Sequence, residues 1–432
     1  MQRIRILALV LGACFVSTAC AQQLATALPV TRHLLHQMAN HKLTTPAALA
    51  NQRFHAQANP DNEKVWDLGA YPGGTWAKLF GISDFGVAAG AGDVAGDQRM
   101  IGVPLFGHNA GNWFESGISS GVVDELLPAI STTGMIAGTI TGENGQPEAY
   151  AWVPGLAGYH LGRLPGDFIS YAYAVNHPAT FIVGQSFGYS QQGTIIGTAV
   201  VWTPRVGWAN GKPALTWEIH ALPSNGLEEP GAVFEGVTLR FWGGWGVNDY
   251  GQIAGDGYQY DPVLDEWWEI AVVWNPRKHG GGWELQRLPA AAGIVYTEAL
   301  AINNLGEIVG DVWESNAFPA RWKQDPRTHS WSVYVLPTTP ALDYGWSIAW
   351  HINDRGDIVG YCTDENWLPQ ATRWNTHDLG SVKSLGFPGD VSHAFSVNNS
   401  GIAVGGYLNI VSYDENGNPI FGPEQAAAVR FP

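Results

Sequence analysis

Residues 299–310, ALAINNLGEIVG, decide the fold because near-copies of this stretch return along the chain. The further copies are AWHINDRGDIVG ending at Gly360, GWGVNDYGQIAG at Gly255, AFSVNNSGIAVG at Gly405, AYAVNHPATFIVG at Gly184, LPAISTTGMIAG at Gly138 and LFGISDFGVAAG at Gly90. Each copy has an alternating strand, a turn such as residues 303–306, and a second strand, which is the pattern of a β-hairpin. Recurrence at roughly 50 residues indicates a repeat architecture.

A third and a fourth strand follow each hairpin. The third carries a tryptophan in most copies, at Trp152, Trp202, Trp274, Trp322 and Trp374. The fourth closes on Leu-Pro or Leu-Gly, as in WEIHALP, WELQRLP and WSVYVLP. Four strands in each repeat describe the blade of a propeller. The sequence therefore predicts an all-β, seven-bladed β-propeller over residues 64–432.

The two ends of the repeat region indicate how the ring closes. The last copy stops after its third strand, AAAVRFP, whereas KVWDLG at Lys64–Gly69 has the fourth-strand pattern and precedes the first hairpin. Pairing of this N-terminal strand with the last blade would cover an open sheet edge. We expect residues 22–63, which lie outside the repeat, to form a short helix and a linker.

The repeats resemble the extracellular HAF repeat, which is named for a His-Ala-Phe triplet. SHAFSVNNSG, residues 392–401, carries that triplet, and the resemblance runs from about residue 64 to the end of the chain. The second repeat departs from the pattern at Ser131, and the third has Ala179 in place of the turn glycine. The resemblance implies an extracellular, propeller-like protein and brings no catalytic motif with it.

The N-terminus reads as an export signal. Arg3 and Arg5 precede an apolar run, residues 6–16, that is too short to span a bilayer. The small residues around Cys20 favour cleavage before Gln22, with lipidation of Cys20 as the alternative. We therefore expect a secreted or periplasmic protein with a signal peptide at residues 1–21 and no later transmembrane span. Cys362, which would be the last cysteine left, reads as a small buried apolar residue.

The charge of the chain limits its partners. The formal net charge is −16, and removal of Arg3 and Arg5 with the signal gives −16 − 2 = −18. This charge argues against nucleic acid, which requires a basic face. We expect a monomer that needs no metal and no cofactor and that has carbohydrate as its partner.

The loops on one face of the propeller are acidic and aromatic, which suits a sugar. Aromatic rings cover the apolar faces of sugars, and carboxylates accept hydrogen bonds from hydroxyl groups. The fourth repeat has the longest loops, and long loops in compact domains are usually functional. The predicted ligand-binding residues are Lys78, Trp242, Trp245, Asp256, Tyr258, Trp313 and Trp346.

The innermost strands supply the candidate catalytic residues. His351 stands where the other six repeats have Gly, Ala or Ser, so it either fills a gap or points into the channel for a chemical reason. Tyr171, Glu298 and His393 occupy the start of their inner strands, and Arg240 lies in the long loop before the fourth hairpin. Hydrolysis of a glycoside would pair Glu298 with a second acid. A polysaccharide lyase would use a His or Tyr base together with a cation.

Two classes of function remain open. The first is a carbohydrate-active enzyme, either a glycoside hydrolase or a polysaccharide lyase, and the asymmetry of the fourth repeat and of His351 favours it slightly. The second is a non-catalytic scaffold that binds glycan or protein at the cell surface.

Overall fold

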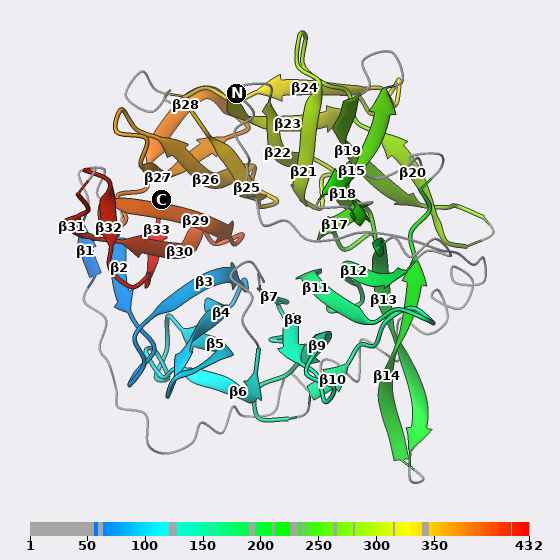
Figure 1. The fold of residues 1–432 in the computed structure, drawn as a ribbon, viewed down its shortest axis with the longest axis horizontal. Helices are drawn as coiled ribbons and strands as arrows, with labels where there is room; N and C mark the ends of the chain where they lie inside the picture. Colours follow the sequence, from blue (N-terminus) through cyan, green and yellow to red (C-terminus); the bar gives the residue numbers. More distant parts are fainter. Residues whose placement is uncertain are drawn as a thin grey trace.

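The described part of the chain is built from β-strands around a central channel (Figure 1). The structure is a computed structural model. It describes residues 56–58, 64–120, 128–156, 158–189, 195–209, 212–224, 232–234, 237–239, 242–261, 266–279, 281–313, 316–338, 345–415 and 417–431. Within these residues no helix is long and apolar enough to cross a membrane.

Seven blades make up the ring, and in blades 1 to 6 the four strands follow chain order from the channel outward. Blade 1 is β3 (Ala77–Ile82), β4 (Val87–Val94), β5 (Asp97–Pro104) and β6 (Phe114–Ser119). Blade 2 is β7 (Ala129–Ile130), β8 (Ile136–Thr141), β9 (Pro147–Trp152) and β10 (Gly158–His160). Blade 3 is β11 (Ile169–Val175), β12 (Ile182–Tyr189), β13 (Ile195–Ala209) and β14 (Lys212–Ala221). Blade 4 is β17 (Trp242–Val247), β18 (Ile253–Asp261), β19 (Glu266–Pro276) and β20 (Trp283–Arg287).

Blades 5 and 6 follow the same order, blade 7 takes its outer strands from before blade 1 in the chain, and two short ribbons lie outside the blades. Blade 5 is β21 (Tyr296–Ile302), β22 (Ile308–Trp313), β23 (Ala317–Gln324) and β24 (Trp331–Val335). Blade 6 is β25 (Ile348–Ile352), β26 (Asp357–Thr363), β27 (Pro369–Asn375) and β28 (Asp378–Ser384). Blade 7 is β29 (Val391–Val397), β30 (Ile402–Leu408), β33 (Gln425–Arg430), β2 (Lys64–Gly69) and β1 (Ala56–Ala58). The ribbons are β15 (Ala232–Phe234) with β16 (Val237–Leu239), and β31 (Ile410–Tyr413) with β32 (Pro419–Phe421).

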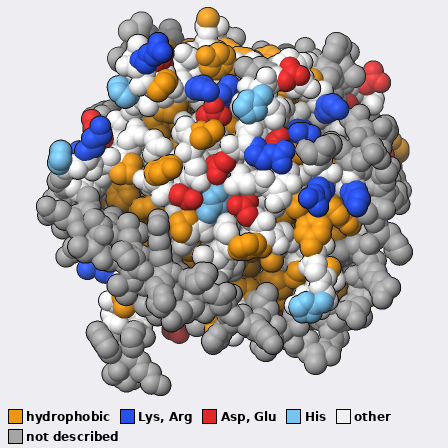
Figure 2. Space-filling view, turned by 180° about the vertical axis from the view of Figure 1, so that it is seen from behind, with side chains coloured by type: hydrophobic (Ala, Val, Ile, Leu, Met, Phe, Trp, Pro, Cys, Tyr) orange, Lys and Arg blue, Asp and Glu red, His pale blue; other side chains and the backbone are white. Residues whose placement is uncertain are grey.

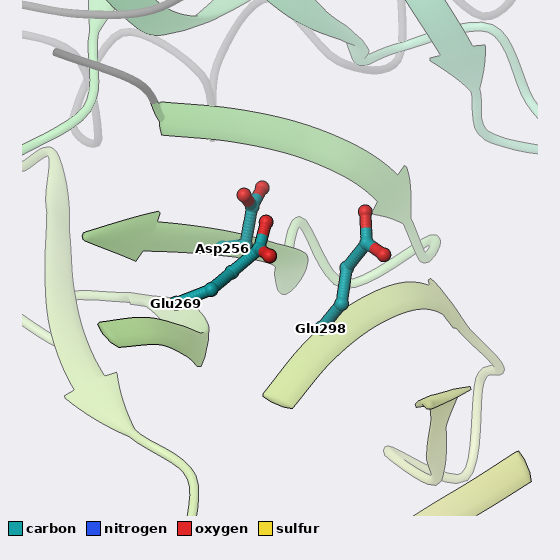
Figure 3. A group of neighbouring side chains, drawn as sticks. All are labelled: Asp256, Glu269 and Glu298. Carbon is teal, nitrogen blue, oxygen red and sulfur yellow. The ribbon is translucent and has the colours of Figure 1, made fainter. Parts of the chain in front are cut away.

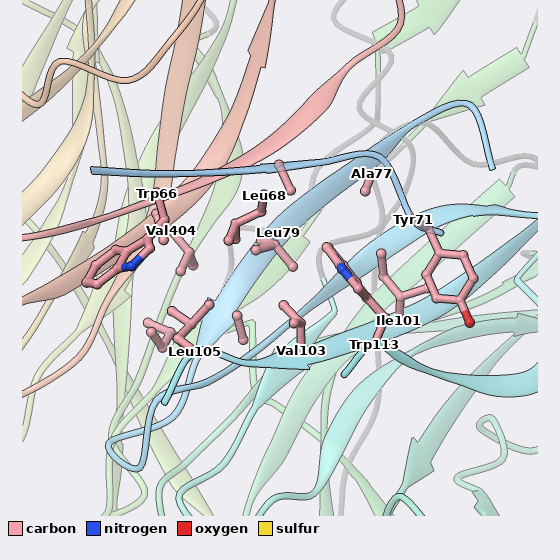
Figure 4. Close-up of a cluster of buried hydrophobic side chains, with 14 of the residues drawn as sticks. Trp66, Leu68, Tyr71, Ala77, Leu79, Ile101, Val103, Leu105, Trp113 and Val404 are labelled. Atoms are coloured by element: carbon pink, nitrogen blue, oxygen red, sulfur yellow. The ribbon is translucent and has the colours of Figure 1, made fainter. Parts of the chain in front are cut away.

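The predicted seven-bladed fold and its closure are confirmed. β2 lies antiparallel to β33, with Val65 opposite Val429, so the N-terminal strand completes the last blade. Trp66 and Leu68 of β2 are buried in one cluster with Leu79 of blade 1 and Val404 of blade 7 (Figure 4). The closing strand therefore joins the first and last blades through apolar packing as well as through the ladder. β1 adds a fifth strand that the sequence did not predict, within the stretch expected to be linker.

The last glycine of the repeat motif is required by a close approach of backbone. A Cβ on Gly310 would lie 2.0 Å from the carbonyl oxygen of Glu298 on the inner strand. The same clash, with the inner strand's carbonyl oxygen 1.7–2.0 Å away, holds at Gly90, Gly184, Gly255, Gly360 and Gly405. Only glycine leaves room for the inner strand at this level.

Next to this contact the inner strand carries a β-bulge, which inserts one extra residue. In blade 5 the bulge falls between Ala299 and Ala301 and leaves Leu300 without a cross-strand partner. The equivalent extra residues are Phe80, Tyr173, Trp245, Trp350 and Phe395. All of these residues line the channel, so the bulge turns large side chains toward the axis.

The asparagine of the motif holds its own turn and the next blade together. Asn353 Oδ1 accepts hydrogen bonds from the backbone N–H groups of Arg355 and Asp357, at 3.0 and 2.8 Å. Its Nδ2 donates to the carbonyl oxygen of Asn398 in blade 7 at 2.8 Å. Asn248, Asn303 and Asn398 make the same bond to their next blades, and the one from Asn398 reaches Ser83 of blade 1. The repeated asparagine therefore encodes the inter-blade contact.

Candidate functional site

Aromatic side chains gather on blades 5 and 6 at the ends of the strands that meet the long loops. Tyr296 begins β21 and Trp313 ends β22, and their rings stack with centroids 3.9 Å apart. Trp346 lies just before β25, and its ring centroid is 6.3 Å from that of Trp313. All three side chains are partly exposed.

Trp367 extends this row. It lies in the loop between β26 and β27, is 60% exposed, and has a φ of 63°. A positive φ is rare for a bulky residue, and here it belongs to the turn in which the Trp367 N–H bonds the Asp364 carbonyl oxygen at 3.0 Å. Its ring packs on Gly345, the neighbour of Trp346, where a Cβ would lie 2.4 Å from the indole. We call Tyr296, Trp313, Trp346 and Trp367 the aromatic platform.

Acidic side chains lie next to the platform, two residues away from it along β21 and β22. Glu298 pairs with Asp311 across β21 and β22, two residues from Tyr296 and Trp313, so both pairs share one face of the ladder. From blade 4, Asp256 of β18 and Glu269 of β19 point toward Glu298 (Figure 3). All four acids are buried. We call Asp256, Glu269, Glu298 and Asp311 the carboxyl cluster.

Burial and mutual repulsion shift the titration of the carboxyl cluster. Loss of solvent raises the pKa of Asp256 to about 6, partly offset by the hydrogen bond from Trp245 Nε1. Burial first, then the charge of Asp256, raises the pKa of Glu269 well above its usual value. Burial and the charges of Glu269 and Asp311 do the same for Glu298. These carboxyl groups therefore hold protons at pH values where an exposed acid is ionised.

The carboxyl cluster has the donor chemistry for either protons or a hard cation. Oxygens of Asp256, Glu269 and Glu298 lie within 4.8 Å of one another. Carboxylate oxygens are the ligands that Ca²⁺ prefers. Tyr258, whose hydroxyl donates to Glu269 Oε1 at 3.1 Å, supplies one more oxygen.

Several predicted site residues come together here. Trp245, Asp256, Tyr258 and Glu298 all belong to or contact the carboxyl cluster, and Trp313 and Trp346 belong to the platform above it. Trp242 begins β17, but its side chain is outside the described residues, as is Arg240.

Two other predicted residues lie on the far side of the ring, at blades 1 and 7. Lys78 forms an ion pair with Glu424 at 3.0 Å, and its ammonium lies 4.9 Å from the centre of the Phe395 ring. His393 packs between Phe395 and Tyr361, and burial together with Lys78 lowers its pKa to about 3. This histidine is therefore neutral at physiological pH.

The last two predicted catalytic residues are Tyr171, in blade 3, and His351, at the channel. Tyr171 is buried against Tyr173 and Phe187, and burial raises the pKa of Tyr171 to about 12. His351 lines the channel and accepts a hydrogen bond from the Val397 N–H at 3.4 Å. Burial lowers the pKa of His351 to about 4.

The sequence pattern did not single out four residues of this region, namely Tyr296, Trp367, Glu269 and Asp311. Tyr296 lies two positions before Glu298 and Asp311 two before Trp313, so strand alternation would have placed each pair on one face. Glu269 sits in a third strand that otherwise reads as core. For Trp367, nothing in the sequence announces the positive φ.

Comparisons with known proteins find only distant structural neighbours. No family model and no curated protein matches the chain. Among solved structures, the β-propeller domain of the Trilobed protease from Pyrococcus furiosus is 12% identical, with a TM-score of 0.37 over 72% of this chain and 96% of that one. Trypanosoma rangeli sialidase is 14% identical at a TM-score of 0.42, over 76% of this chain and 57% of the sialidase. The BP39L lectin from Burkholderia pseudomallei is 13% identical at 0.41, over 82% and 98%.

Proposed function

We propose that this chain is an exported propeller that binds poly- or oligosaccharide on the aromatic platform. The observation that carries the proposal is the row of partly exposed rings from Tyr296 through Trp313 and Trp346 to Trp367. Neighbouring rings offer a continuous apolar surface to successive sugar units, whereas isolated exposed aromatics offer only one contact.

The charge of the molecule limits the classes of polysaccharide that it can bind. The chain is strongly acidic overall, with a formal net charge of −16. This charge repels polyanionic glycans and favours neutral ones or those with amino groups. Neutral polysaccharides are therefore the first ligands to test.

Binding is tested with a panel of polysaccharides by affinity electrophoresis and calorimetry. We expect Trp313→Ala and Trp367→Ala each to weaken binding about tenfold, which is about 1.4 kcal/mol. Tyr250→Ala is the matched control, because Tyr250 is 69% exposed but lies in the turn between β17 and β18, at the opposite ends of the strands. Unchanged affinity in both tryptophan variants, or no glycan bound by the folded wild type, would refute the proposal.

Glycoside hydrolysis is a second candidate, favoured by the raised pKa of Glu298. A general acid must keep its proton at the working pH, and the nearby carboxyl groups give it a partner at short range. The same panel, assayed for new reducing ends, tests this activity. Glu298→Gln should abolish any turnover while leaving binding intact, and absorbance of unsaturated uronates would instead reveal a lyase.

A further inference from the structure

A cavity of about 140 Å³ lies within the central channel, separate from the platform. It extends from the bulged residues of the inner strands to the turns that end those strands. A cavity of about 150 Å³ in another protein accepts a molecule the size of benzene. This space is therefore large enough for a small organic ligand.

Aromatic rings form one end of the cavity. Phe80, Tyr173, Trp245, Trp350 and Phe395 line it, all of them bulged residues. Phe395 contacts both Phe80 and Trp350, with ring centroids 5.0 and 5.7 Å apart. The buried Nε1 of Trp350 has no hydrogen-bond partner among the described residues. Rings brought from five blades to one space form an aromatic cage, in which a cation is stabilised by the π faces.

Carboxylates form the other end. Asp249 and Asp354 line the cavity at the turns of blades 4 and 6. Asn304 between them donates from Nδ2 to an Oδ2 of each, at 3.1 and 3.0 Å. Seen from behind the ring, acidic side chains gather about a histidine near the centre of the face (Figure 2). The Asn304 amide therefore holds both carboxylates in place at this end of the cavity.

In alkaline solution, the other charged groups near the cavity do not cancel the negative potential of Asp249 and Asp354. No Lys or Arg occurs among the described residues that line it. His351 is neutral because burial lowers its pKa to about 4. His177 lines the same end, 3.3 Å from Asp249, and that contact raises the pKa of His177, so a higher pH favours its uncharged form. Lys78, beyond the Phe80 and Phe395 rings, is paired with Glu424.

We propose that the channel cavity binds a small organic cation, namely an ammonium group that carries methyl substituents. Such a cation is weakly hydrated, so it can leave water for aromatic faces, whereas its charge remains attracted to Asp249 and Asp354. A small inorganic ion suits the cavity less well because half of the lining offers no oxygen ligands. An uncharged ligand of the same shape gains neither interaction with the carboxylates nor cation–π stabilisation.

The test is calorimetry with tetramethylammonium chloride on the full mature chain in alkaline buffer, with tert-butanol as the uncharged analogue and sodium chloride as the ionic-strength control. We expect saturable binding of tetramethylammonium alone. Trp350→Leu should weaken binding at least tenfold and Trp350→Phe less, because a phenyl ring keeps part of the π interaction. Trp313→Ala, on the platform, should leave it unchanged.

Each contrary outcome overturns the proposal. These outcomes are no saturable binding to the wild type, equal binding of tert-butanol, wild-type affinity in Trp350→Leu, or loss of binding in Trp313→Ala. Circular dichroism and melting temperature establish that each variant folds. If Trp350→Leu does not fold, Phe395→Leu, which removes a neighbouring ring of the same cage, takes its place with the same expectation.

Discussion

The indole Nε1 of Trp322 donates a hydrogen bond of 2.8 Å to the carbonyl oxygen of Pro289 in the preceding blade. Trp274 bonds Pro223 and Trp374 bonds Pro337 in the same way, both at 2.7 Å. Each of these tryptophans is almost fully buried on a third strand, and each proline follows a fourth strand. Two sequence signatures of the repeat, the tryptophan and the Leu-Pro, are therefore the two halves of one contact between blades.

Trp322→Phe should lower the free energy of unfolding by about 1–3 kcal/mol, because the partly buried Pro289 carbonyl loses its donor. Trp331→Phe is the matched control. The Nε1 of Trp331 is buried without a hydrogen-bond partner in the described part of the chain, so its removal leaves no acceptor unpaired. Urea denaturation of both variants compares the two losses. Equal destabilisation would mean that ring volume, and not the hydrogen bond, accounts for the effect.

Asn398→Asp should destabilise the ring closure between blades 7 and 1. The new carboxylate can still accept the Ser400 and Ile402 N–H bonds but cannot donate to the Ser83 carbonyl. We expect a loss of at least about 2 kcal/mol at neutral pH, and a smaller one in acid, where the carboxyl group is protonated. Thermal melting at two pH values measures it. The exposed Asn144→Asp should show neither effect, and a matching loss there would contradict the inter-blade role.

Leu68→Ala should lower the free energy of unfolding, because the whole ring depends on its N-terminal strand. Leu68 is 2% exposed in the cluster that joins blades 1 and 7, and such truncations cost about 2–5 kcal/mol. Deletion of β2 should lower the melting temperature further, because it also leaves the edge of β33 open. The exposed Lys64→Ala is the control. An unchanged melting temperature after the deletion would rule out closure by this strand.

The carboxyl cluster should make the protein less stable as the pH rises. The pKa of Asp256 is 3.8 in a free chain and about 6 in the fold, so between these values the folded state binds more protons than the unfolded state. The free energy of unfolding therefore falls from about pH 4 to about pH 6. Asp256→Asn should flatten this fall by roughly 1–3 kcal/mol. Chemical denaturation across that range checks it, and the same slope in variant and wild type would contradict the shift.

Titration of His351 should have the opposite effect and make the protein less stable as the pH falls. Burial lowers the pKa of His351 from 6.5 to about 4, so in this interval the unfolded state binds the extra proton. Its contribution to stability is complete above about pH 6.5 and is lost as the pH falls toward 4. His351→Gln should lose less stability than the wild type over the same acid range. A steeper acid loss in the variant would refute the neutral histidine.

The sequence by itself determined the seven blades, the strand order within each blade and the closure by residues 64–69. These follow from local signals, namely alternation, turn residues and a repeat, and each blade packs only on its neighbours. It also placed Glu298, Asp256, Trp313 and Trp346 in the region of interest, because unusual residues stand out against a regular repeat. The export signal and the HAF-repeat resemblance stay predictions.

Only the tertiary structure decided which of those residues meet. Asp256 and Glu298 are 42 positions apart and approach because blades 4 and 5 lie face to face, a relationship that no strand pattern contains. The aromatic cage arises from a β-bulge repeated in different blades, and the position of Trp367 depends on one positive φ. Local sequence fixes hydrogen bonding along a strand, whereas contacts across blades depend on how the complete ring packs.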